Sequence, residues 1–127
     1  MIWVPFICRK NLHYTEAVGH FHLYAWLQDA VGRRCSISPE FPTGNGKVDL
    51  VLHTKNHRAV IEVKSLREVW ELHAYREQAA RYATKLGLAQ ATLVVFAPVD
   101  DESVLLPYAG EALQDDVRVT TVPFGWV

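Results

Sequence analysis

Residues 44–66 read GNGKVDLVLHTKNHRAVIEVKSL, and this stretch decides how the rest of the chain is interpreted. Two apolar runs, 48–52 and 60–64, are rich in β-branched residues and are separated by the polar residues 54–57. Two such runs joined by a short polar break are typical of a β-hairpin. The sequence therefore predicts two antiparallel strands with a turn centred on residues 55–56.

This turn sets Asp49 directly opposite Glu62 on neighbouring strands, and Lys64 follows on the same face because side chains alternate. Opposed residues have Cβ atoms about 4.5–5.5 Å apart, and like charges at that distance destabilise a sheet. One interpretation is an ordinary hairpin with a solvated polar face. The other is a carboxylate pair that holds a hard cation such as Mg²⁺, which removes the repulsion.

The composition is that of one globular domain, 1–127, since half of the 127 residues are apolar and a fifth are charged. No apolar run approaches the ~20 residues of a membrane span. The N-terminus is apolar first and basic afterwards, which is the reverse of a signal peptide. Cys8 and Cys35 lack metal-ligand spacing, so we expect reduced thiols in a cytoplasmic protein.

The charge is unevenly distributed along the chain. Residues 1–85 contain twelve Lys or Arg and eight Asp or Glu, whereas residues 86–127 contain one and six. A polyanion would therefore contact the first two-thirds. The net charge of −1 argues against a tight, sequence-independent DNA binder. Arg33 and Arg34 either contact phosphates or complement a helix dipole.

A first helix is predicted over residues 15–31, with Gly32 as its stop. At 100° per residue, Glu16 and His20 fall on the stripe that faces the core. Glu16 is either part of a site or a first-turn acid that the helix dipole favours. His20 is better interpreted as a hydrogen-bonded residue at the edge of the core.

A second helix is predicted over residues 66–86, started by a capping box of Ser65 and Glu68 and stopped by Gly87. Beside its apolar stripe runs a polar and aromatic line with spacing i, i+4, i+7 and i+11. The line consists of Glu71, Tyr75, Gln78 and Tyr82. It either borders a cleft or covers the edge of the core.

Other elements are predicted around these. Residues 33–41 suggest a strand, and the apolar run 91–97 suits a central strand beside a helix crossover. A short helix is expected from about residue 100 to 113, and a last edge strand over 117–122. Residues 1–7 read as a strand or a lid.

In this order, three motifs resemble the PD-(D/E)XK nuclease superfamily: Val48-Asp49, then Glu62-Val63-Lys64, then the Q-x-x-x-Y pattern from Gln78 to Tyr82. The last pattern is similar to the RecB-like branch. The resemblance covers roughly residues 15–97, and Val48 stands where the family name has proline. It implies an α/β fold with a restriction-endonuclease-like αβββαβ core, in which helices flank a mixed central sheet.

The resemblance implies a Mg²⁺-dependent deoxyribonuclease that leaves a 5′-phosphate, with Mn²⁺ expected to substitute for Mg²⁺. The metal ligands would be Glu16, Asp49, Glu62 and the carbonyl of Val63. Lys64 would orient or deprotonate the attacking water, while Gln78 and Tyr82 would position the water, the phosphate or Lys64. An inactive family member would keep Lys64 as an ion-pair partner of Glu62.

The expected substrate is DNA, and the RecB-like motif favours an end-processing or defence nuclease. With few spare basic residues, the chain is expected to act as a homodimer or with an ATPase or larger assembly. Candidate nucleic-acid contacts are Arg9, Lys10, Lys47, Arg67 and Arg81. The alternatives are a resolvase-like enzyme for Holliday junctions, an RNA-cutting enzyme, and a catalytically silent module that binds nucleic acid or protein.

Overall fold

The computed structural model describes residues 12–42 and 47–125, without the side chains of residues 12–20, 39–42, 47–49 and 102. The described chain forms α1 (Leu12–Val31), β1 (Ser36–Pro42), β2 (Lys47–His53), β3 (Arg58–Ser65), α2 (Glu71–Lys85), β4 (Gln90–Ala97), the 3₁₀ helix η1 (Glu102–Tyr108), β5 (Gly110–Gln114) and β6 (Val117–Gly125).

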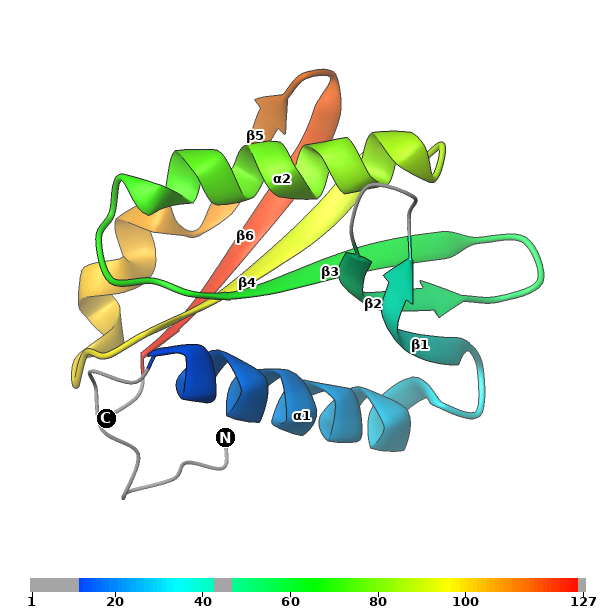
Figure 1. Ribbon diagram of the computed structural model, residues 1–127, viewed down its shortest axis with the longest axis horizontal. Helices are drawn as coiled ribbons and strands as arrows, with labels where there is room; N and C mark the ends of the chain where they lie inside the picture. Colours follow the sequence, from blue (N-terminus) through cyan, green and yellow to red (C-terminus); the bar gives the residue numbers. More distant parts are fainter. Residues whose placement is uncertain (1–11, 43–46, 126–127) are drawn as a thin grey trace.

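The strands form one mixed sheet in the order β1-β2-β3-β4-β6-β5 (Figure 1). Strands β1, β2 and β3 pair antiparallel, β4 pairs parallel with both β3 and β6, and β5 pairs antiparallel with β6. Helix α2 makes the crossover that the parallel β3–β4 pair requires. The predicted α/β class and the central position of residues 91–97 are confirmed.

The two long helices cover opposite faces of this sheet (Figure 1). Beneath α1, a cluster of Val63, Val94 and Phe96 packs with Leu23, and the Phe96 ring stacks on Phe124 at 5.7 Å between centroids. Beneath α2 lies the larger core cluster, in which small residues of the helix pack closely on apolar residues of the strands. The alternation of side chains along each strand thus divides the core into two layers.

The predicted hairpin is confirmed, with its register. The pairs run from His53 opposite Arg58 to Leu50 opposite Ile61, and the backbone N–H of Thr54 donates to the His57 carbonyl at 2.8 Å. The described pairs end one position before Asp49 and Glu62, so the opposition of these two residues stays a prediction. Strand β3 then continues to Ser65 in parallel pairing with β4.

Two predicted element boundaries in the first part of the chain were wrong. Helix α1 begins at Leu12, three residues before the predicted start. The first strand begins at Ser36 because the preceding residues turn away from the helix, where the N–H groups of Arg34 and Cys35 donate to the Val31 carbonyl. The strand then includes Pro42.

The predicted capping box of α2 was also wrong. Ser65 is the last residue of β3, and α2 begins only at Glu71, after Trp70, which makes no side-chain cap. The Glu71 carboxylate instead accepts the N–H groups of Arg67 and Glu68 at 3.0 and 2.8 Å. The predicted end is confirmed, since Gly87 follows the helix with a φ of 72°.

The C-terminal prediction of a helix to about residue 113 was wrong after Tyr108. Strand β5 follows η1, and it forms a hairpin with β6 through Asp115 and Asp116, whose φ angles are 50° and 67°. Two consecutive positive φ angles are the geometry of a type I′ turn, which aspartate tolerates. Strand β6 is therefore internal, between β4 and β5, and not the predicted edge strand. The expected strand or lid at residues 1–7 lies outside the described residues.

Candidate active site

The carboxylate of Glu62 lies in the buried layer between the sheet and α2. Along β3, Val60 belongs to the α2-facing core and Val63 to the opposite one, so the alternation directs Glu62 toward α2. Only 1% of Glu62 is exposed, and its Cα neighbour on β4 is the fully buried Leu93. A charged carboxylate in such a place is costly unless it is paired.

Lys64 supplies a positive charge at the rim of this layer. Its Nζ lies 3.9 Å from Oε2 of Glu62, and its side chain is 19% exposed. The same Nζ lies 5.8 Å from the centre of the Tyr75 ring, within the range of a cation–π contact. The ammonium group thus sits between a buried carboxylate and an aromatic face.

The polar and aromatic line of α2 reaches this pair at Tyr75. The Nε2 of Gln78 donates to the Tyr82 hydroxyl at 3.1 Å, and Tyr82 is buried. One turn earlier, the Tyr75 hydroxyl lies 3.1 Å from the Ser65 carbonyl and 3.2 Å from Oε2 of Glu71. The line therefore connects helix α2 to the end of β3 beside Lys64.

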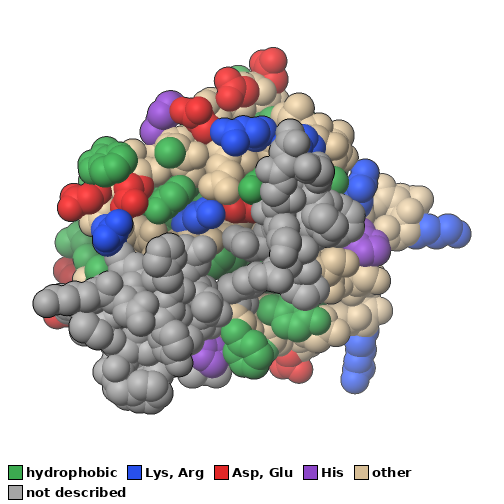
Figure 2. Space-filling model, viewed as in Figure 1, with side chains coloured by type: hydrophobic (Ala, Val, Ile, Leu, Met, Phe, Trp, Pro, Cys, Tyr) green, Lys and Arg blue, Asp and Glu red, His purple; other side chains and the backbone are tan. Residues whose placement is uncertain are grey.

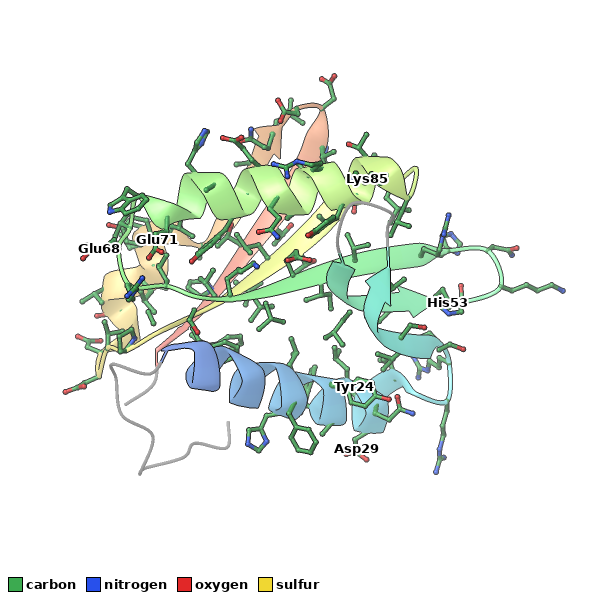
Figure 3. All side chains as sticks on the ribbon, viewed as in Figure 1. Tyr24, Asp29, His53, Glu68, Glu71 and Lys85 are labelled. Carbon is green, nitrogen blue, oxygen red and sulfur yellow. The ribbon has the colours of Figure 1, made fainter. Side chains whose placement is uncertain are left out.

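Glu71 fixes the entry into this helix, at the opposite end from Lys85 (Figure 3). Its partial burial alone would raise the pKa of the Glu71 carboxyl. The N–H groups of Glu68 and Arg67, the Tyr75 hydroxyl and the charge of Arg67 outweigh this effect, so the pKa is lowered. Glu71 is therefore held as a carboxylate that organises the β3–α2 connection.

The predicted metal ligands are described only in part. Glu62 and Val63 lie in β3, whereas the side chains of Glu16 and Asp49 are outside the described residues, although the backbone of both lies in regular elements. Among the described side chains, no three His, Cys, Asp or Glu residues gather as a metal group. The Glu62 carboxylate and the Val63 carbonyl are oxygen donors of the kind that a hard cation prefers, so the described part of the predicted ligand set is compatible with one.

The predicted nucleic-acid contacts are likewise described in part. Arg67 is exposed in the connection before α2, and Arg81 is exposed on α2 itself. Arg9 and Lys10 lie outside the described residues, as does the side chain of Lys47. In Figure 2, Lys and Arg side chains appear along this face among acidic ones and do not form a single dense patch.

The polar contacts of Lys64 and Arg76 in this layer were not predicted from the sequence. The cation–π contact of Lys64 with Tyr75 depends on where α2 crosses the sheet. Arg76 donates from Nε to the buried Thr121 hydroxyl at 3.3 Å and from Nη2 to the Tyr108 carbonyl at 3.4 Å. The only sequence signal for Tyr75 was its place in the polar line, four residues after Glu71.

Fold and site together define an α/β domain with a buried carboxylate–lysine pair beneath its crossover helix. The chain belongs to the family described as a domain of unknown function (DUF8371), whose model matches residues 6–98. No curated protein and no solved structure matches the chain. Within the described residues, no helix is both long and apolar enough to span a membrane.

Proposed function

We propose that this domain is a metal-dependent nuclease that hydrolyses phosphodiester bonds of DNA on a restriction-endonuclease-like core. The first six elements follow the order αβββαβ, and β4 lies parallel beside β3 in the sheet. The family match, residues 6–98, spans these six elements and ends just after β4. This agreement supports treating α1 to β4 as the functional unit and η1, β5 and β6 as an addition.

The observation that carries the proposal is the burial of Glu62 with Lys64 two residues later on the same face. A strand needs no carboxylate at a position that is 1% exposed, and a buried ion pair is weak support for stability. Catalytic groups, in contrast, are often found in such perturbed, partly desolvated places. The hydrogen-bonded Gln78 and Tyr82 on the covering helix complete the resemblance to the RecB-like motif.

In this mechanism Asp49, Glu62, the Val63 carbonyl and Glu16 would hold Mg²⁺. The bound metal supplies a water of lowered pKa and neutralises charge on the phosphate. Lys64 orients or deprotonates the attacking water, and its ammonium form stabilises negative charge that develops on the phosphate oxygens. Gln78 and Tyr82 position the water, the phosphate or Lys64.

The surrounding partners follow from the same proposal. In this proposal the substrate is DNA, and the near balance of 13 Lys or Arg against 14 Asp or Glu supports action as a homodimer or beside an ATPase within a larger assembly. Cys35 is a free thiol, which agrees with a cytoplasmic site of action.

The test is cleavage of plasmid, linear duplex and single-stranded DNA, and of RNA, with Mg²⁺, with Mn²⁺ and with chelator. Wild-type protein and the control Asp29→Ala, an exposed aspartate on α1, should cut DNA only with metal. Asp49→Ala should not cut. Equal cutting by Asp49→Ala would contradict the proposal. Intact DNA in every lane, together with no Mg²⁺ binding by calorimetry, would indicate the silent binding module.

A further inference from the structure

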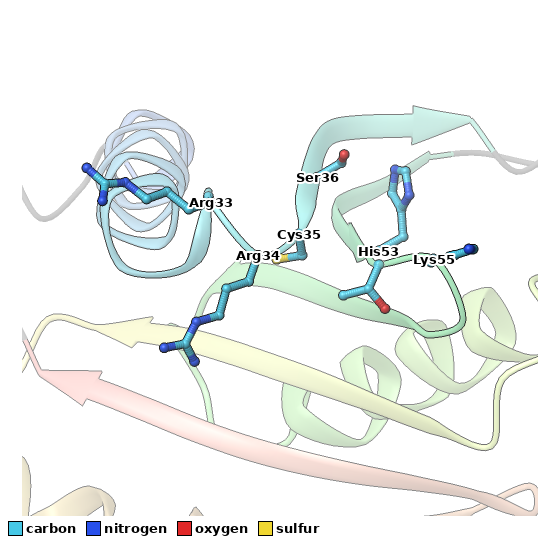
Figure 4. Close-up of a pocket in the computed structure, with 8 residues that line it drawn as sticks. Arg33, Arg34, Cys35, Ser36, His53 and Lys55 are labelled. Carbon is cyan, nitrogen blue, oxygen red and sulfur yellow. The ribbon is translucent and has the colours of Figure 1, made fainter.

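A polar hollow lies at the other end of the hairpin from Glu62. Residues 32–36, which link α1 to β1, form one side, and residues 53–55 at the hairpin turn form the other, enclosing a volume of ≈390 Å³ (Figure 4). The lining contains Arg33, Arg34 and Lys55 and no acidic residue. The hollow therefore has a positive rim in a protein whose net charge is −1.

The cations of this rim have no structural task among the described residues. Arg33, Arg34 and Lys55 are exposed, and none has a carboxylate partner in the part of the chain whose side chains are described. The neighbouring Arg58, in contrast, is anchored, since its Nη2 donates to the Leu86 carbonyl at 3.1 Å. Unpaired cations on a shared rim remain available for an external anion.

The end of α1 does not need these arginine side chains as caps. The Val31 carbonyl already accepts the N–H groups of Arg34 and Cys35 at 2.9 and 3.1 Å, and the Cys35 thiol lies 3.5 Å from the same oxygen. The Gln28 carbonyl accepts the N–H of Gly32 at 3.0 Å. These carbonyl groups at the end of α1 thus have hydrogen-bond donors other than the two guanidinium groups. The side chains of Arg33 and Arg34 remain exposed.

The direction of the side chains selects the kind of anion. In Figure 4 the side chains of Arg33 and Arg34 extend to one side of the hollow and Lys55 extends to the other. Cations that diverge in this way do not converge on one compact anion. They suit an extended polyanion whose charges are spaced along its length, as in a nucleic-acid backbone.

The hairpin turn beside the hollow is fixed by hydrogen bonds and belongs to the same hairpin as Glu62. The hairpin turn is closed by Thr54 and His57 through hydrogen bonds of 2.8 and 3.2 Å. From Arg58 at the turn to Glu62 is four strand residues, about 13 Å at 3.3 Å per residue. Figure 2 shows Lys and Arg side chains at the right-hand edge of the molecule, where Figure 1 places this turn.

From these observations we infer that the hollow and its rim, Arg33, Arg34 and Lys55, form a contact surface for the phosphate backbone of a nucleic acid. The inference rests on the proposed function, because the bound polymer is the one that the Glu62 centre would cleave. The surface holds the polymer at a distance from the reacting phosphate, so it adds affinity and contributes nothing to the chemical step.

The test is fluorescence anisotropy of labelled duplex and single-stranded DNA in chelator, over a series of salt concentrations. Arg33→Gln/Arg34→Gln should weaken binding about tenfold at low salt, and adding Lys55→Gln should weaken it further. The slope of log affinity against log salt should lose about one unit for each contact removed. Arg118→Glu is the control, because it changes the net charge by the same two units at an exposed position on β6.

Equal weakening by Arg118→Glu would overturn the inference, since net charge alone would then explain binding. Absence of binding by the wild-type protein would also overturn it. Inorganic phosphate competing as well as DNA, at equal phosphate concentration, would overturn it in favour of a compact-anion pocket. Each variant should melt at the wild-type temperature, because all three residues are exposed.

The two proposals fail separately. Asp49→Ala should bind DNA like the wild type, and Arg33→Gln/Arg34→Gln should still cut when DNA is saturating. Loss of binding in the arginine variant without cleavage by any protein would keep the contact surface and remove the nuclease. Cleavage by the wild type together with unchanged DNA binding in the arginine variant would keep the nuclease proposal and remove the contact surface.

Discussion

The two faces of the central sheet are built from the same strands and differ in chemistry. Beneath α1, the cluster around Val63, Val94 and Phe96 is apolar and contains stacked phenylalanine rings. Beneath α2, the buried layer includes the carboxylate of Glu62 and the hydroxyl of Thr121. Neighbouring residues of β3 thus enter an apolar core on one side and, on the other, a larger apolar core that also contains a buried carboxylate.

This difference distinguishes the residues that stabilise the fold by packing from the polar residues that the fold holds in the candidate site. The α1 face is accounted for by apolar burial, which contributes about 25 cal/mol per Å². The α2 face includes groups that packing does not require. The small side chains of Ala79, Ala80 and Ala83 let α2 approach the sheet, and Tyr75 of the polar line of the helix contacts Lys64.

The largest expected effect comes from removing the charge of Glu62 without changing its shape. If the proposed function holds, Glu62→Gln should lower the rate of DNA cleavage at least about thousandfold, about 4 kcal/mol of transition-state stabilisation, because a proposed metal ligand is lost. Initial cleavage rates and Mg²⁺ titration calorimetry measure this. Glu77→Gln, on the outer side of α2, is the matched control. If Glu62→Gln cut DNA at the wild-type rate, the α2 face would not be the face that carries the catalytic site.

The next largest effect lies on the α1 face and concerns stability. Phe96→Ala should lower the free energy of unfolding by about 3–4 kcal/mol, because it empties a buried site and breaks the stack on Phe124. Urea denaturation measures the loss. Cleavage per folded molecule should remain at the wild-type rate. A specific loss of catalysis in this variant would show that the α1 face also serves the site.

The sequence predicted best what depends on local periodicity. The alternation and the Lys55-Asn56 break defined the hairpin and its register, and the continuous apolar run defined β4. The common line of Gln78 and Tyr82 on α2 was also predicted, because residues four apart are neighbours on a helix, whereas the hydrogen bond between them was not. In the candidate site, the buried position of Glu62 and its closeness to Lys64 follow from the same strand.

The features that the sequence did not predict depend on tertiary context, or on which of two side chains accepts a hydrogen bond. Ser65 looked like a helix cap, but parallel pairing with β4 holds it in the sheet, and Glu71 provides the hydrogen bonds instead. Asp115 and Asp116 are typical turn residues, but the turn was missed because a helix was predicted for the residues before them. The contact of Lys64 with Tyr75 needs the position of α2 over the sheet, which no local pattern contains.

A smaller effect is expected from removing the hydrogen bond between Gln78 and Tyr82 of the Q-x-x-x-Y motif. Tyr82→Phe should cost about 1 kcal/mol of stability, since one partly buried hydrogen bond is lost. It should slow cleavage about tenfold, which corresponds to a similar free energy. Tyr24→Phe on α1 is the control. A double-mutant cycle with Gln78→Ala should show that the two losses are not additive, and additive losses would mean that the pair does not act as a unit.

The smallest expected effect is the pH dependence that Glu71, a member of the polar line, gives to the free energy of unfolding. Its pKa is lower in the folded protein than its ordinary value of 4.5, so its carboxylate stabilises the fold fully above that value. This stabilisation should disappear as the pH falls below 4.5 through the lowered pKa. Urea denaturation of the wild type and Glu71→Gln should show a difference in unfolding free energy that is constant near neutral pH and shrinks in acid. A difference that grew in acid would mean that burial dominates and that the hydrogen bonds from Arg67, Glu68 and Tyr75 do not hold the charge.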